Sequence, residues 1–174
     1  GSEIELGIGS LFAGDERRVL IEFEASLDAG EVRGLDGSIG WTRVGGAATE
    51  ARFDHLDVAG TSDPREVEAA RNLSVVASAV SALASLRQMQ AAAAYDQGDS
   101  ARAQALIQEN LADIRAAATA MPAPLAAPLE AQAAEYAGTG NAFASAPPSS
   151  MAGKVAAKKA VSKEHSNLAR KAAY

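Results

Sequence analysis

The chain has 174 residues, 48% of them hydrophobic, and a formal net charge of −6. This length and hydrophobic content are enough to bury a core in one domain or in a small domain plus a helical part. It contains no cysteine, which excludes a disulfide framework, a thiolate nucleophile and zinc held by cysteine. No run of 18 apolar residues occurs, so no transmembrane helix is predicted, and the aromatic content of 5% favours close-packed helices over a large aromatic pocket.

Charge is distributed unevenly along the chain. Residues 1–71 carry 15 acids and 7 bases, whereas residues 146–174 carry 1 acid and 6 bases. Every lysine lies in the last of these segments: Lys154, Lys158, Lys159, Lys163 and Lys171. This asymmetry predicts an acidic body and a basic C-terminal segment.

Residues 3–25 are predicted to form two strands joined by a charged turn. Gly1-Ser2 is typical of a cloning remnant and is left out of the fold argument. Apolar residues alternate with polar ones at 4–8 and again at 19–25, the period of a half-buried strand. The turn between them is interpreted as an exposed interaction loop, with a solvated turn as the alternative, and its candidate residues are Asp15, Glu16, Arg17 and Arg18.

Two more strands are predicted before residue 60. Leu35, Ile39 and Trp41 indicate a third strand, and Val44-Gly45-Gly46-Ala47 indicates a hairpin turn. Residues 48–58 then return as a fourth strand, with Ala51, Phe53 and His55 on one face. Four strands are too few for a self-sufficient sandwich, so the antiparallel β part at 3–60 needs a cover.

Residues 61–145 are predicted to form a helical hairpin or bundle. Asp63-Pro64-Arg65-Glu66 is a variant of the capping box that begins a helix, and Asn72 marks a break before a longer one. Gly98 and Asp99 predict the end of that helix and the cap of the next. The predicted apolar stripe of the longer helix is Val76, Val80, Leu83 and Arg87 with Leu86 and Gln90 close by; that of the next helix is Ala103, Leu106, Ile107, Leu111 and Ile114.

The C-terminal part is predicted to contain two further helices. Met121-Pro122-Ala123-Pro124 interrupts the helical pattern, and a third helix is expected at 125–137 with its end at Gly138. Residues 142–150 are typical of a linker. The segment 146–174 is therefore interpreted as a linker and a basic C-terminal helix, whose candidate interaction residues are Lys154, Lys158, Lys159 and Lys163. Docking of this helix on the acidic body is one interpretation, and binding of nucleic acid or of a membrane surface are the others.

Two motifs carry a family resemblance. The first motif is Gly9-Ser10-Leu11-Phe12-Ala13-Gly14-Asp15-Glu16-Arg17-Arg18-Val19-Leu20, and the second, further on, is Glu66-Val67-Glu68-Ala69-Ala70-Arg71-Asn72. Together they resemble the region that follows the von Willebrand factor A (VWA) domain in bacterial and eukaryotic proteins. The resemblance covers most of the chain, fades between 116 and 150, and returns at Lys163–Arg170. It implies strands that complete a sandwich beside a VWA domain and helices that offer a docking surface.

The VWA domain itself is not within this sequence. In that family it binds a divalent metal through an Asp-x-Ser-x-Ser loop, but Asp36-Gly37-Ser38-Ile39-Gly40 has glycine where the second serine belongs. No metal site is therefore predicted. The chain is expected to be a fragment of a longer VWA protein or a partner that carries the complementary half.

Residues suited to catalysis are few. His55 and His165 are the only histidines, and His55 is placed to pair with Asp57 on the same strand face, which is more typical of a surface ion pair than of a catalytic dyad. No phosphate-binding glycine loop, nucleophile elbow or carboxylate pair is present. No cofactor, small-molecule substrate or catalytic residue is predicted.

The sequence thus predicts an α+β chain, with a small antiparallel sheet or partial sandwich followed by a helical hairpin or bundle. The predicted function is a non-enzymatic, structural or protein-interaction module of a VWA-type protein. Its expected partner is another protein or its own VWA domain, and self-association into a homo-oligomer is a further expectation. The alternative function is an adaptor that binds nucleic acid or an acidic surface through its lysine-rich tail.

Overall fold

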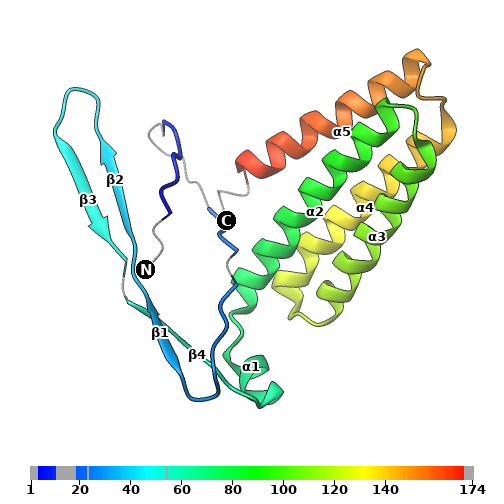
Figure 1. Cartoon of the computed structure of the whole chain (residues 1–174). Helices are drawn as coiled ribbons and strands as arrows, with labels where there is room; N and C mark the ends of the chain where they lie inside the picture. The colour runs from blue at the N-terminus through cyan, green and yellow to red at the C-terminus, as the bar shows by residue number, and fades with distance from the viewer. Residues whose placement is uncertain (1–3, 11–18, 23, 54, 171–174) are drawn as a thin grey trace. The chain divides into compact units, whose positions relative to one another are not determined.

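The predicted α+β class is confirmed by the computed structural model, which describes residues 4–10, 19–22, 24–53 and 55–170 (Figure 1). In this described part of the chain, four short strands precede five helices. The described residues group by their contacts into two units: Glu22–Arg71 forms one, and Gly1–Ile21 with Asn72–Tyr174 forms the other. The first unit holds all four strands and the second holds the four long helices.

The strand unit contains two antiparallel ladders in series. The inner pair is β2 (Ser38–Thr42) with β3 (Ala48–Arg52), and the outer pair is β1 (Val32–Leu35) with β4 (Leu56–Ala59). The predicted turn between β2 and β3 is confirmed, since Gly45 takes a positive φ of 72° and Gly46 N–H donates to the Arg43 carbonyl at 2.9 Å. These strands do not close into a sandwich.

Several strand predictions were wrong. The fourth strand predicted at 48–58 is divided into β3 and β4, and the described residues of 4–8 and 19–25 form no strand. Ile4, Val19 and Ile21 are exposed. Alternation of apolar and polar residues permits a strand, but strand hydrogen bonds also require a neighbouring strand, and the pattern does not supply one.

The helices begin where the sequence predicts caps. α1 (Pro64–Ala70) starts with Asp63, whose carboxylate accepts from Arg65 N–H at 2.9 Å. Only half of the predicted capping box forms, because the Glu66 carboxylate accepts from the Thr61 hydroxyl and not from Asp63 N–H. The predicted break is confirmed at Asn72, which caps α2 (Leu73–Asp96) by accepting from Ser74 N–H at 3.1 Å.

Four long helices form a bundle (Figure 1). α3 (Ser100–Thr119) and α5 (Met151–Arg170) both pack on α2, and α4 (Ala123–Ser145) contacts the other three. The predicted turn after α2 is confirmed: Gly98 has φ 90°, and the Asp99 carboxylate caps α3 through Arg102 N–H at 2.9 Å. The helical hairpin predicted at this turn is therefore one corner of a four-helix arrangement.

The predicted end of the third helix at Gly138 was wrong. α4 continues through Gly138 and Gly140 to Ser145, so the linker shortens to residues 146–150. Gly140 is buried, and a Cβ there would lie 3.3 Å from Ile107 Cγ2 on α3. This glycine thus permits close approach of two helices and does not end one.

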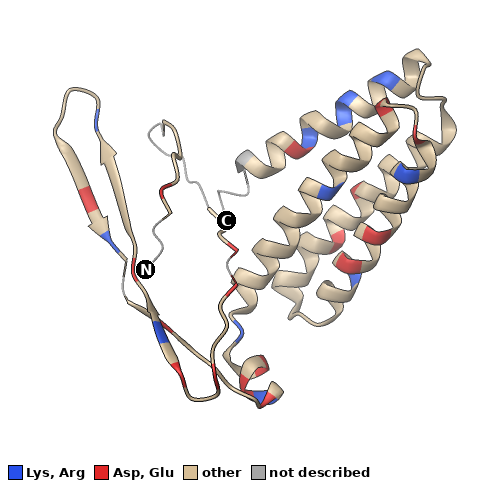
Figure 2. Cartoon of the chain, viewed as in Figure 1, with Lys and Arg blue, Asp and Glu red and all other residues tan. Residues whose placement is uncertain are grey.

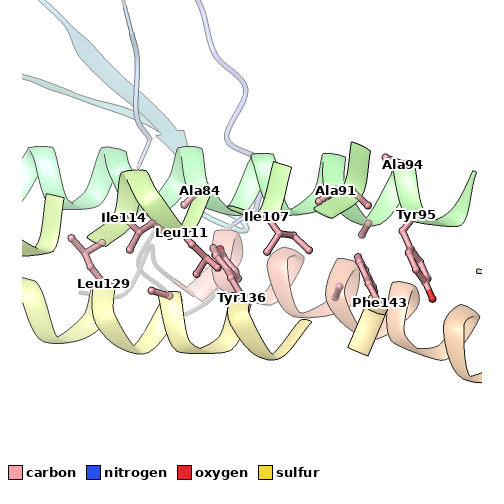
Figure 3. Packing of buried hydrophobic residues seen from close by; sticks show 14 of the residues in the cluster. Ala84, Ala91, Ala94, Tyr95, Ile107, Leu111, Ile114, Leu129, Tyr136 and Phe143 are labelled. Carbon is pink, nitrogen blue, oxygen red and sulfur yellow. The ribbon is translucent and has the colours of Figure 1, made fainter. Parts of the chain in front are cut away.

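Small side chains dominate the core of the bundle (Figure 3). Its bulky members include Ile107, Ile114 and Leu129, and Tyr95 stacks on Phe143 with ring centroids 4.0 Å apart and planes 8° apart. Most of the remaining buried apolar residues are alanines. Helices that meet through alanine approach closely, and each contact buries little apolar area.

The predicted core face of α2 was right only in part, since Val80 packs against the core. Leu83 and Leu86 are 55% and 48% exposed, whereas Ser81, Ser85 and Gln88 are buried. α2 is apolar on nearly every side, so periodicity does not identify its inner face. Three other helices crowd this helix, and the closely packed positions are filled by small residues.

Candidate functional site

The inner ladder of the strand unit has one apolar and one polar face. Cross-strand partners are Ile39 with Ala51 and Trp41 with Thr49, so their side chains project to the same side. Phe53 joins them, because its N–H donates to the Gly37 carbonyl at 2.8 Å and extends the ladder by one residue. We call Ile39, Trp41, Ala51 and Phe53 the ribbon face.

The aromatic rings of the ribbon face are open to solvent. Trp41 is 41% exposed and Phe53 is 61% exposed. The ring of Phe53 lies over Gly37, where a Cβ would be only 2.6 Å from Phe53 Cδ2. The opposite side of the ribbon carries Glu50 and Arg52, which form an exposed ion pair at 3.8 Å. The ribbon therefore presents apolar surface on one side only. An exposed apolar patch with a polar opposite side is typical of an interaction surface.

His55 joins the two ladders at their junction. Its Nδ1 lies 2.7 Å from Asp36 Oδ1 and its Nε2 lies 3.0 Å from Asp57 Oδ1. The ring is also close to Gly34, where a Cβ would lie 2.2 Å from His55 Cε1. The hydrogen bond to Asp36, together with the charges of Asp36 and Asp57, raises the pKa of His55.

The predicted pairing of His55 with Asp57 is confirmed, and Asp36 is the partner that sequence reasoning missed. Asp36 is 19 residues from His55, so only the strand register brings them together. The two carboxylates occupy different ring nitrogens and do not converge on a common point. Among the described residues, no group of three metal-ligating side chains is placed to hold a metal ion.

The four candidate lysines all lie on α5 (Figure 2). Lys163 Nζ forms an ion pair with Glu135 Oε1 of α4 at 2.8 Å. Lys154, Lys158 and Lys159 are exposed and form no ion pair with any residue that the structure describes. The lysines thus divide into one that attaches α5 to the bundle and three that face solvent.

α5 docks on the bundle through a face of small residues. Gly153, Ala157, Ala160 and Glu164 are its buried positions, and they recur at helical spacing. A Cβ at Gly153 would lie 2.2 Å from the Pro147 carbonyl oxygen and 2.8 Å from the Tyr95 hydroxyl. The predicted C-terminal helix therefore docks, but close packing of small residues holds it more than charge does.

An open groove of about 750 Å³ lies between α2 and α5. Ala92, Ala93, Ala157 and Val161 supply its apolar lining, and Lys158 lies beside it. Asp96 and His165 also border the groove. Sequence reasoning missed the groove because it lies between helices separated by more than fifty residues.

A hydrogen-bonded network crosses the interior of the bundle. Ser81 Oγ donates to Gln132 Oε1 at 2.7 Å, and the Gln132 amide reaches the Tyr136 hydroxyl. Tyr136 in turn donates to Glu164 Oε2 of α5 at 2.8 Å, and burial raises the pKa of the Tyr136 hydroxyl. The network links α2, α4 and α5.

Glu164 is the only acidic residue of α5 and is 2% exposed. Asn167 Nδ2 donates to the same carboxylate oxygen at 3.1 Å. Among the described residues no cation lies within ion-pair distance of this carboxylate. This arrangement fixes the register of α5 on the bundle.

The charged turn with Asp15, Glu16, Arg17 and Arg18 lies outside the described residues. No family model matches the chain, and no curated protein or solved structure matches it significantly. The VWA resemblance therefore stays a prediction. No single described helix is long and apolar enough to cross a membrane, and only α1 with α2, bent by 87°, passes that test as a pair.

Proposed function

We propose that this chain is a non-enzymatic protein-interaction module whose recognition surface is the ribbon face. One observation carries the proposal: none of the described residues of Glu22–Arg71 is buried. Two-stranded ladders are at most marginally stable alone in water, since they bury too little apolar surface to offset the lost chain entropy. A partner that covers Trp41 and Phe53 would supply the missing burial.

The composition of the ribbon face suits protein recognition. Trp and Tyr are among the residues that contribute most to binding when an interface covers them, because each buries a large area with few rotatable bonds. Trp41 and Phe53 lie on the same side of adjacent strands and can enter one partner surface together. The resemblance to the region after a VWA domain makes such a domain one partner to test.

The lysine-rich adaptor is supported less well. Of the four candidate lysines, Lys163 is already paired with Glu135, which leaves Lys154, Lys158 and Lys159 for an external anion. Each phosphate contact contributes modestly and is lost as salt rises, so three lysines would give weak, strongly salt-dependent binding. Titration with duplex DNA at low and high salt measures this directly.

A photo-crosslinking amino acid tests the proposed function with a built-in control. Benzoylphenylalanine replaces Phe53 on the ribbon face in one variant and Arg52 on the polar face in the other. In extracts of cells that make the chain, the Phe53 variant is expected to yield a discrete protein adduct and the Arg52 variant is not. Equal yields from the two positions, or no adduct from either, would overturn the proposal.

A further inference from the structure

We propose that the ribbon face of one copy docks into the α2–α5 groove of a second copy of this chain. This inference rests on the proposed function, because it names the partner that covers the ribbon face. Both halves of the contact belong to the described chain: an exposed pair of aromatic rings and an open apolar groove.

The groove has the size and chemistry to receive an aromatic side chain. Its volume is about 750 Å³, and its apolar lining includes Ala92 and Ala93 on α2 and Ala157 on α5. Docked rings would contact the exposed methyl group of Ala93 and the half-buried Val161 in place of water. Association would therefore bury apolar area on both sides of the contact.

Charge favours the same pairing. Glu22–Arg71 carries 11 acids and 5 bases, so the unit that displays the ribbon face is strongly acidic. α5 has a single acid, the buried Glu164, and its exposed Lys154, Lys158 and Lys159 lie along the helix that forms one wall of the groove (Figure 2). Asp96 on the opposite wall offsets part of this charge locally. The net arrangement attracts an acidic unit to a basic helix and orients the encounter.

The two surfaces differ, so the contact is heterologous. Each copy that docks its ribbon face still offers its groove, and each copy that receives one still offers its ribbon face. Such contacts produce rings or open chains of copies, in contrast to the closed pair that a two-fold interface gives. The expected behaviour is growth of the assembly with concentration.

Sedimentation of the full chain tests whether copies associate. The concentration is varied over about 1 to 300 µM, a range that covers the dissociation constants of weak self-association. Average mass is expected to rise with concentration and to fall when NaCl is raised from about 0.05 to 0.5 M. Trp41 is the only tryptophan, so its emission is expected to shift to shorter wavelength as copies associate. A chain that stays monomeric over the whole range overturns the inference.

Two variants then locate the contact. Ala93→Glu adds a negative charge inside the groove at an exposed helix position, and Ala112→Glu makes the same change on the exposed side of α3, away from the groove. Ala93→Glu is expected to weaken association about thirtyfold, as loss of a principal interface contact does, and Ala112→Glu is expected to leave it unchanged. Equal effects of the two variants would overturn the assignment to the groove.

A mixing experiment distinguishes contact between copies from contact within one copy. Trp41→Ser weakens one half of the contact and Ala93→Glu the other, so each variant alone is expected to associate about thirtyfold more weakly than the parent chain. Mixed, they retain one intact pairing and are expected to form a complex of two chains and no larger species. A mixture that stays monomeric contradicts the inference. If the chain is monomeric but the Phe53 crosslinker captures another protein, this inference fails and the proposed function stands.

Discussion

The docking of α5 makes a quantitative prediction for two glycine substitutions. Gly153→Ala places a methyl group 2.2 Å from the Pro147 carbonyl oxygen and 2.8 Å from the Tyr95 hydroxyl. The carbonyl belongs to the turn that begins α5, where it accepts from Ser150 N–H at 3.0 Å. Because a backbone group cannot rotate away as a side chain does, the turn must shift, and the Tyr95 hydrogen bond to the Ala146 carbonyl weakens with it.

Gly138→Ala is the matched control. Gly138 lies inside α4, and a Cβ there meets nothing within 4 Å. Alanine at such a site is expected to stabilise the chain by about 0.5–1 kcal/mol, since glycine loses more backbone entropy in a helix. Overpacking at Gly153 costs about 1–3 kcal/mol and outweighs the smaller propensity gain near a helix end.

The two variants are therefore expected to differ by about 1.5–4 kcal/mol in unfolding free energy, with opposite signs relative to the parent chain. Urea unfolding followed by circular dichroism at 222 nm measures both. If Gly153→Ala proves as stable as Gly138→Ala, the close contact between α5, the 147–150 turn and Tyr95 is refuted.

Three further predictions concern polar groups. Glu164→Ala removes the acceptor of the Tyr136 hydroxyl and is expected to lower the unfolding free energy by about 1–3 kcal/mol, whereas Glu164→Gln keeps that acceptor and is expected to cost less; urea unfolding checks both. Gln88 is buried without a hydrogen-bond partner among the described residues, so Gln88→Leu is expected to raise the thermal midpoint, and a lower midpoint would contradict this. The pKa of His55 is raised, so its pairing with Asp36 and Asp57 stabilises the strand unit fully below the ordinary His pKa and less as pH rises through the raised value. Trp41 emission measured from pH 5 to 9 is expected to report this loss, and His55→Asn is expected to remove it.

Local signals in the sequence predicted the helix boundaries best. Asp63, Asn72, Gly98 and Asp99 were assigned as caps or breaks, and the structure places a helix terminus at each. Capping chemistry acts within three or four residues, so a short stretch of sequence contains all of it. Gly138 was misassigned because the residue type alone does not distinguish a glycine inside a helix from a glycine at its end. The difference lies in the residues that surround it.

Non-local features of the chain were not predictable in this way. The partner of Tyr136 is Glu164, which is 28 residues away, and the partner of His55 is Asp36, which is 19 residues away. Nothing in a helical pattern rich in alanine specifies which small residue faces which neighbour. The ribbon face was predicted in part, because the faces of a strand follow from period two once the hairpin turn at 44–47 is identified.

The distribution of bulky apolar residues supports an interaction role by a separate route. The bundle buries mostly alanine, whereas Trp41, Phe53, Leu83 and Leu86 remain on the surface. A monomer gains most stability when its largest apolar side chains are inside, since each contributes about 1.5–3 kcal/mol on full burial. Leaving them outside forgoes that stabilisation unless a partner covers them. Association of the chain would therefore supply burial that its own fold omits, and the strand unit, which buries no described residue, is where the gain would be greatest.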